Sequence, residues 1–158
     1  MINHPFPPLF DGNSEKLILG SFPSVASREQ NFYYGFSRNR FWLALAGVFN
    51  KPVPETVDEK KKFILSHRLA LWDVISSCDI EKSSDKSIKN AAPNDIVSLI
   101  KNTNIRAVYL NGAVSYELYK KFFSKKIDLP AFKLPSTSPL NAAFSLENLI
   151  KNWRIIDL

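Results

Sequence analysis

The apolar run Lys16-Leu17-Ile18-Leu19-Gly20-Ser21 ends at a glycine, which is the pattern of a short buried strand. Runs of the same kind follow at residues 69–74, 105–110 and 131–135. Helical patterns separate them, and no hairpin signal joins one run to the next. Strands that alternate with helices form a parallel sheet covered on both faces. The sequence therefore predicts an α/β fold, a three-layer α/β/α sandwich with a central four-stranded parallel sheet.

The predicted helices lie between and after these strands. Apolar positions at helical spacing and helix-start residues indicate helices at residues 40–49, 57–67, 93–100, 112–123 and 146–156. Two long connections remain, an aromatic-rich loop over residues 22–39 and a polar loop that ends near Pro93. In parallel α/β sheets the ligand crevice lies beyond the carboxyl ends of the strands. Residues 22–39 and 136–141, which follow the first and fourth strands, are therefore expected to line one site.

The size and composition of the chain favour one self-sufficient domain over residues 1–158. No internal repeat, low-complexity segment or linker divides the 158 residues. The 12 Phe, 5 Tyr and 3 Trp supply a large apolar core, so folding needs no disulfide or metal. The single cysteine, Cys78, and two distant histidines, His4 and His67, are too few for a structural zinc or iron–sulfur site. We therefore expect no metal and no cofactor.

The charge and the absence of sorting signals bear on location and partners. No stretch approaches the roughly 20 apolar residues of a membrane span, and the N-terminus lacks the pattern of a signal peptide, so the cytoplasm is the expected compartment. The net charge of +6 suits a partner that is a polyanion. Much of that charge, however, lies in lysine runs at 60–62 and 120–121 that are typical of solvated helix faces. Charge alone therefore does not assign nucleic-acid binding.

Five segments spread along the chain resemble the signature segments of one enzyme family. They are Gly20-Ser21-Phe22-Pro23-Ser24; Tyr33-Tyr34-Gly35 leading into Asn39-Arg40-Phe41-Trp42; Leu71-Trp72-Asp73-Val74-Ile75 with Ser77-Cys78; Asn90-Ala91-Ala92-Pro93-Asn94-Asp95; and Leu134-Pro135-Ser136-Thr137-Ser138-Pro139-Leu140-Asn141. In order and spacing they are similar to hypoxanthine-DNA glycosylases (DNA-deoxyinosine glycosylases), a family of the uracil-DNA glycosylase superfamily. The resemblance covers nearly the whole chain. It implies a DNA repair enzyme that hydrolyses the N-glycosidic bond of a deaminated base, most simply hypoxanthine, in double-stranded DNA.

The resemblance assigns the catalytic amide to Asn39. Mismatch-specific uracil-DNA glycosylases carry a catalytic Asn in the loop after the first strand, where this chain has Phe22. A phenyl ring neither holds a water nor donates a hydrogen bond, so the usual uracil mechanism is not expected. Read from the residues alone, an Asn before a helical pattern is a typical N-cap, and a cap at a loop-to-helix junction would also hold a catalytic side chain firmly. Two roles remain open, since the amide can stabilise the leaving base or its carbonyl can orient water.

The resemblance also implies a base-binding pocket. The loop Gly20, Ser21, Phe22, Pro23 and Ser24 would contribute backbone N–H donors to the departing base. Tyr34 occupies the family's stacking position for a base flipped out of the duplex, and Phe22 is a second candidate. Either ring could instead be a core residue. No lysine lies in these segments, so we expect a monofunctional enzyme that leaves an abasic site.

The segment after the fourth strand resembles the superfamily loop that contacts DNA. The segment Ser136-Thr137-Ser138-Pro139 would contact phosphates and fix register through the hydroxyl and backbone N–H donors of its Ser and Thr residues, while Leu140 would be the wedge that fills the gap in the duplex. Asn141 could contact DNA or cap the last helix. Arg40 would reach phosphate. Without the resemblance, the same residues read as an ordinary Ser/Pro turn.

Two questions stay open at this point. Asp73, at the end of the second strand, either anchors a loop or polarises water, and the anchor is the simpler role. The alternatives to a hypoxanthine enzyme are a uracil or mismatch-specific DNA glycosylase and a non-catalytic module that binds damaged DNA. A monomer is the simplest assembly.

Overall fold

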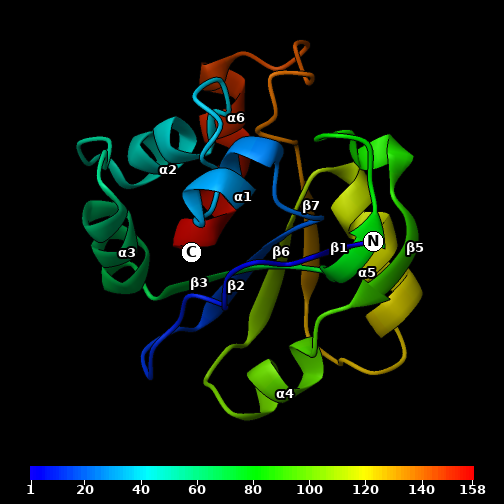
Figure 1. Cartoon of the computed structure of the whole chain (residues 1–158). Coiled ribbons are helices and arrows are strands. Elements are labelled where there is room, and N and C mark those ends of the chain that lie inside the picture. Colours follow the sequence, from blue (N-terminus) through cyan, green and yellow to red (C-terminus); the bar gives the residue numbers. More distant parts are fainter.

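A sheet of four parallel strands forms the centre of the computed structural model, which describes all residues from Met1 to Leu158 (Figure 1). Its strands are β2 (Lys16–Gly20), β3 (Leu69–Asp73), β6 (Ala107–Asn111) and β7 (Ala131–Leu134), in the spatial order β3-β2-β6-β7. Every neighbouring pair is parallel. The predicted sheet is therefore confirmed, with boundaries that shift by no more than two residues.

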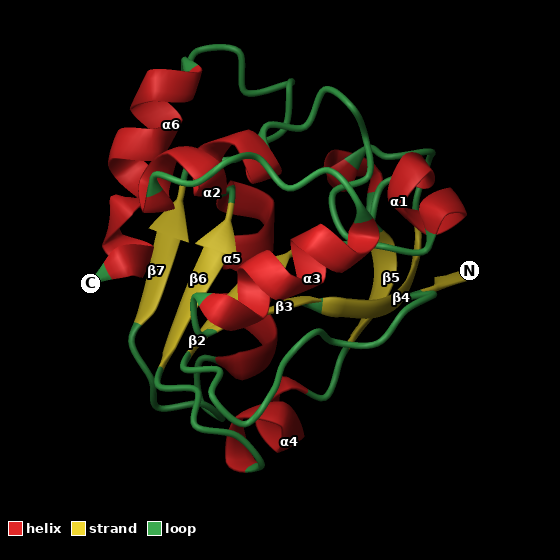
Figure 2. Cartoon of the chain, turned by 90° about the vertical axis from the view of Figure 1, so that its left-hand side faces the viewer, coloured by secondary structure: helices red, strands yellow, loops and turns green.

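Helices cover both faces of this sheet. One face carries α2 (Phe41–Phe49), α3 (Val57–Ser66) and α6 (Leu146–Trp153), which continues into the 3₁₀ helix η2 (Arg154–Asp157). The other face carries α4 (Ile96–Lys101) and α5 (Ala113–Phe123). Figure 2 shows α3 in front of the sheet and α5 behind it. The three-layer prediction is confirmed. No helix has both the length and the apolar composition needed to cross a bilayer.

The alternation of side chains along β2 divides the apolar residues into two cores. Ile18 points into the core beneath α2, α3 and α6, whereas Leu17 and Leu19 point into the core beneath α4 and α5. All three side chains are fully buried. This strand is apolar on both faces because both faces are covered, as expected for a central parallel strand.

A second sheet was not predicted from the sequence. Strands β1 (Ile2–Asn3), β4 (Ile75–Asp79) and β5 (Lys89–Pro93) form an antiparallel sheet in the order β1-β4-β5. Pro93 ends β5, so the prediction that it opens a helix is wrong; α4 begins at Ile96, with Asp95 as its N-cap. The side chains of β5 are mostly exposed, and the buried side chains of β4 do not alternate with exposed ones. The pairing of the two strands also shifts register. Neither strand therefore shows the apolar alternation by which a strand is recognised in a sequence.

The expected loop over residues 22–39 also contains a helix. Helix α1 (Val25–Gln30) begins after Ser24, whose side chain accepts a hydrogen bond from the backbone N–H of Ser27 at 3.1 Å. Its only buried residue is Ser27. A helix of six residues with no apolar stripe has no periodic signal in the sequence, which is why it was missed.

Candidate active site

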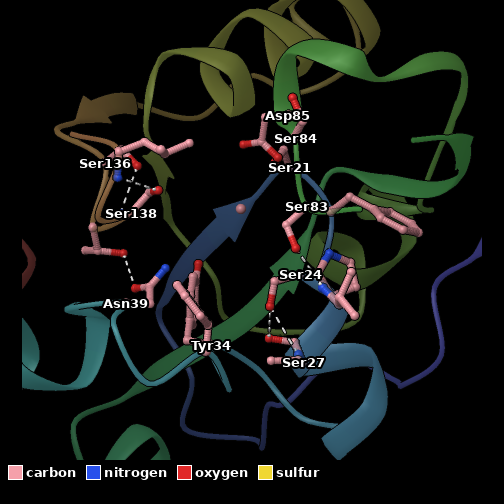
Figure 3. Close-up of a pocket in the computed structure, with 18 of the residues that line it drawn as sticks. Ser21, Ser24, Ser27, Tyr34, Asn39, Ser83, Ser84, Asp85, Ser136 and Ser138 are labelled. Atoms are coloured by element: carbon pink, nitrogen blue, oxygen red, sulfur yellow. Dashed lines mark hydrogen bonds between the residues drawn. The ribbon is translucent and has the colours of Figure 1, made fainter. Parts of the chain in front are cut away.

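A cavity of about 1240 Å³ opens at the carboxyl-terminal edge of the parallel sheet (Figure 3). Its walls come from residues 20–29 and 33–39, which follow β2, from residues 136–140, which follow β7, and from residues 81–85, which connect β4 to β5. Asp73 and Asn111, the last residues of β3 and β6, complete the lining. The two segments expected to share a site do share this cavity, and its volume suffices for a purine nucleotide.

Most residues singled out from the sequence line this cavity. They are Gly20, Ser21, Phe22, Pro23, Ser24, Tyr34, Asn39, Ser136, Thr137, Ser138, Pro139 and Leu140. Arg40 and Asn141 lie next to it but are not part of its lining. The third wall, residues 81–85, was not predicted.

Hydrogen bonds fix the Asn39 side chain in one orientation. Its Oδ1 accepts from the backbone N–H of Phe41 at 3.0 Å and from the hydroxyl of Thr137 at 2.8 Å. A backbone N–H can only donate, so the atom facing it must be the amide oxygen. The amide nitrogen Nδ2 is therefore turned toward the cavity, as Figure 3 shows. The helix N-cap itself is Arg40, one residue later than expected, although Asn39 still satisfies an N–H at the start of α2.

Asn111 extends this network to the end of β6. Its Oδ1 accepts from the backbone N–H of Thr137 at 3.0 Å, which fixes the orientation of its own amide. Its Nδ2 then donates to the Thr137 hydroxyl at 3.0 Å and to the Tyr34 hydroxyl at 3.3 Å. Because the Thr137 oxygen accepts from Asn111, its proton is directed at Asn39. The backbone N–H groups of Phe41 and Thr137 can only donate, so they determine which atom of each amide accepts and therefore the direction of every hydrogen bond in the network.

The Arg40 guanidinium binds protein carbonyls. It donates to the backbone oxygens of Phe144 at 2.5 Å, of Asn141 at 3.1 Å and of Ser138 at 3.4 Å. These carbonyls belong to the segment that follows β7. In this structure Arg40 holds that segment to the start of α2, and the expected phosphate contact would require it to leave these partners.

The segment after β7 is further braced by its own side chains. Ser136 Oγ accepts from the backbone N–H of Ser138 at 3.1 Å, and Asn141 Nδ2 donates to the Ser136 carbonyl at 3.0 Å. Leu140, at the tip, is 89% exposed. A rigid turn therefore presents one apolar side chain to solvent at the mouth of the cavity.

Tyr34 forms an aromatic wall of the cavity. Its ring stacks on Phe41 with a centroid distance of 3.8 Å and an interplanar angle of 14°. Burial, with the Asp73 carboxylate adding to it, raises the pKa of the Tyr34 hydroxyl, so this group stays neutral. Tyr34 has a left-handed backbone, with φ of 52°, which is uncommon for a bulky residue and is concentrated at functional sites.

Phe22 is buried as well, with an exposed fraction of 7%, and the Arg28 guanidinium lies 5.7 Å from its ring centre.

The floor of the cavity is closely packed. A Cβ on Gly20 would come within 2.5 Å of Asp73 Oδ1 and 3.2 Å of the Tyr34 hydroxyl, so a larger residue would have to displace the buried Asp73 carboxylate. Asp73 Oδ2 pairs with Nε2 of His4 at 2.7 Å, and both side chains are almost fully buried. Asp73 thus anchors the N-terminal segment, the simpler of its two expected roles, while its other oxygen lies at the cavity floor.

Two polar residues of the site escaped sequence reasoning. Asn111 could have been found, because it directly follows a predicted strand, at the edge of the sheet where ligands bind. Asp85 carries no such signal, since it lies in a polar segment whose path depends on the second sheet. Burial raises the pKa of Asp85 to about 6; the nearby Asp73 raises it too, and the Ser21 side chain opposes the shift.

Known proteins share both the sequence pattern and the fold of this chain. Residues 7–156 match the family model of the uracil DNA glycosylase superfamily. A hypoxanthine DNA glycosylase of Methanosarcina acetivorans is 33% identical over 160 residues, which cover 99% of this chain and 98% of that protein. Its counterpart from Methanosarcina barkeri is 32% identical over 115 residues, 71% of this chain and 72% of that protein.

A solved structure agrees with these relatives. A solution NMR structure described as a candidate uracil DNA glycosylase from Methanosarcina acetivorans matches this fold with a TM-score of 0.82 and 29% identity, over all of both chains. The family model and the first relative each span nearly the whole length of the sequence. The resemblance read from the five segments is therefore confirmed, and the chain belongs to the uracil DNA glycosylase superfamily.

Proposed function

We propose that this protein is a DNA glycosylase that hydrolyses the N-glycosidic bond of hypoxanthine in DNA and leaves an abasic site. The relatives named hypoxanthine DNA glycosylases support the substrate. The observation that carries the proposal is the locked amide of Asn39, whose Nδ2 is presented to a cavity large enough for a purine nucleotide.

Cleavage of the N-glycosidic bond is favoured by a hydrogen-bond donor that faces the departing base. Breaking the bond between C1′ and N9 puts positive charge on the deoxyribose and negative charge on the departing base, which hypoxanthine spreads over O6 and N7. A fixed N–H donor stabilises that negative charge more than it stabilises the neutral ground state. Because both hydrogen bonds at Asn39 Oδ1 are already made, the amide is available as a donor, and we assign it to the leaving base rather than to water.

The surrounding residues suit a nucleotide flipped out of the duplex. Tyr34, whose ring stacks on Phe41, lines the cavity and offers an aromatic face for the base. Leu140 is exposed on a braced turn and could fill the space that the base vacates. The hydroxyls of Ser136 and Ser138 lie at the same mouth and suit phosphate contacts.

Selectivity follows from the same donor. Adenine has an N6 amino group where hypoxanthine has the O6 acceptor, so a donor facing this position would oppose another donor. Leaving both unpaired in a buried site costs a few kcal/mol. Phe22 replaces the catalytic Asn expected of a mismatch-specific uracil enzyme and offers no hydrogen bond, which disfavours that alternative.

The direct test uses a duplex with one deoxyinosine, followed by alkaline cleavage of abasic sites. We expect the wild-type protein to release hypoxanthine and the variant Asn39→Asp to lose about 10²–10³-fold in single-turnover rate. Aspartate keeps an oxygen for Phe41 and Thr137 but presents an acceptor where the amide presents a donor, so it is the matched variant for the role of Nδ2.

Three outcomes would decide against this proposal. Faster release of uracil than hypoxanthine across a panel of duplexes would select the uracil alternative. Tight binding to an abasic duplex without release of any base would select a non-catalytic binding module. An Asn39→Asp variant as fast as wild type would show that the amide does not donate.

We further propose a monomer that works in the cytoplasm, the compartment in which a lone free thiol such as Cys78 is ordinary.

A further inference from the structure

The hydrogen bonds of Asn39 leave its side chain with no free acceptor for the nucleophilic water. The amide oxygen of Asn39, the group that would orient water, already accepts two hydrogen bonds. If the protein hydrolyses a glycosidic bond as proposed above, another acceptor in the cavity has to bind the water that attacks C1′. The acidic residues of the lining are Glu29, Asp73, Glu81 and Asp85.

The position of Asp85 distinguishes it from the other three. Glu29 and Glu81 are exposed at the rim. Asp73 is buried at the floor and one of its oxygens is held by His4. Asp85 is half-buried in the wall formed by the connection between β4 and β5, close to Ser21 and Ser84. Figure 3 shows this group across the cavity from Asn39 and Ser136.

The segment that carries Asp85 is held in place by hydrogen bonds to α1 and within itself. Ser83 Oγ accepts from the backbone N–H of Val25 at 2.9 Å, and the Arg28 guanidinium donates to the Lys82 carbonyl at 2.5 Å. Within the turn, Ser87 Oγ accepts from the backbone N–H of Glu81 at 2.8 Å. A carboxylate on a braced turn keeps the geometry that acid–base catalysis needs.

The electrostatic surroundings suit a proton acceptor near neutral pH. Burial raises the pKa of Asp85, the hydrogen bond with Ser21 lowers it and the Asp73 carboxylate of β3 raises it, and together they bring it to about 6. The other charged groups on the surrounding elements are Arg28 and Glu29 of α1 and Glu81, Lys82 and Lys86 of the same turn. A base with a pKa just below the working pH is both ionised and basic enough to take a proton.

We propose that Asp85 is the general base that takes the proton of the attacking water. The water oxygen forms a bond to C1′ as the bond from C1′ to N9 breaks, and the electron pair of that bond leaves with hypoxanthine. One proton of the water moves to the Asp85 carboxylate and then to solvent, while the departing base takes up one proton. Asn39 thus stabilises the leaving base from one side and Asp85 activates the nucleophile from the other.

The test is the pH dependence of the single-turnover rate on a deoxyinosine duplex. The wild-type rate should rise tenfold per pH unit below about pH 6 and level off above it, because only the ionised carboxylate accepts a proton. The variant Asp85→Asn should lose about 10²–10⁴-fold in rate at pH 7.5, as general-base removal does, and its remaining rate should no longer follow that titration. Its affinity for an abasic duplex should stay within about twofold.

A matched control separates this role from a general effect of charge or folding. Asp128→Asn removes the same carboxyl from an exposed position in the connection before β7, at the opposite edge of the sheet, and should keep both the rate and its pH profile. Thermal unfolding checks that Asp85→Asn is folded. An Asp85→Asn variant that keeps the rise near pH 6, even at a reduced rate, would overturn the proposal. A wild-type protein that releases no hypoxanthine would instead overturn the proposed function itself.

Discussion

Thr137 connects Asn111, at the end of β6, to Asn39, at the start of α2, through hydrogen bonds. It is fully buried, its hydroxyl accepts from Asn111 and donates to Asn39, and its backbone N–H is bound by Asn111. From the sequence it was expected to contact phosphate, as part of a Ser/Thr-rich turn. Its burial gives it a different task in this structure, which is to set the direction of a neighbouring amide.

Replacing Thr137 with valine should slow base release while leaving DNA affinity nearly unchanged. Valine keeps the shape but removes the hydroxyl, so Asn39 Oδ1 loses one of its two donors and the amide can rotate. An unsatisfied buried polar group costs about 1–3 kcal/mol, which corresponds to a rate loss of about 5- to 150-fold. Single-turnover kinetics on a deoxyinosine duplex measures it.

The serine variant is the control for this prediction. Thr137→Ser keeps the hydroxyl and loses only a methyl group, so most of the wild-type rate should return. Equal losses in the serine and valine variants would assign the effect to packing and remove the orienting role of the hydroxyl.

At the scale of elements, the contact between α2 and α6 places Asn39 relative to the segment after β7. Gly47 of α2 lies directly against Ile150 of α6, and an added Cβ would come within 2.7 Å of Ile150 Cγ1. The indole N–H of Trp153, also in α6, donates to the Pro135 carbonyl at 2.9 Å. The Trp153 ring also packs edge to face on Phe41, the first residue of α2, so α6 supports both the start of α2 and the start of the turn that contains Thr137.

Gly47→Ala should destabilise the protein, against the usual preference for alanine in helices. Alanine gains about 1 kcal/mol in helix propensity, but the clash with Ile150 costs about 1–3 kcal/mol and pushes the helices apart. The second substitution Ile150→Ala should relieve that clash, so the double variant should be more stable than the sum of the single changes by about 0.5–3 kcal/mol. Chemical denaturation of the four proteins measures this coupling. Gly12→Ala is the control, because a Cβ there meets nothing within 4 Å, and it should change the free energy of unfolding little. If the effects of Gly47→Ala and Ile150→Ala on the free energy of unfolding simply add, the proposed contact is refuted.

The elements that could be predicted are those whose burial leaves a periodic trace. The strand around Ile18 is apolar on both faces, and the helix around Leu149 repeats its apolar positions every three or four residues. The strand Lys89–Pro93 has almost no buried side chain and α1 buries only Ser27, so neither could be recognised locally. Asp85 was missed for the same reason, because its place in the cavity is set by the tertiary path of a polar segment.

At the scale of the whole molecule, the distribution of positive charge decides how the protein should meet DNA. The net charge is +6. Several lysines of this excess lie on helices, such as Lys60 over Trp42 and Lys120 over Tyr116. Arg38 and Lys82, in contrast, are exposed on the lining of the cavity, on segments that follow β2 and β4. Arg40, the cation expected to reach phosphate, is occupied by backbone carbonyls.

We therefore expect Arg38 and Lys82 to carry phosphate contacts at the mouth. Each contact that is lost should reduce the slope of log affinity against log salt concentration by about one, because fewer counterions are released on binding. Titrations of Arg38→Ala and Lys82→Ala with an abasic duplex at several salt concentrations measure this slope. Lys125→Ala, beyond the end of α5 that points away from the cavity, removes the same formal charge and should leave the slope unchanged. Equal slopes in all three variants would mean that DNA affinity depends on the net charge of the protein and not on specific phosphate contacts at the mouth of the cavity.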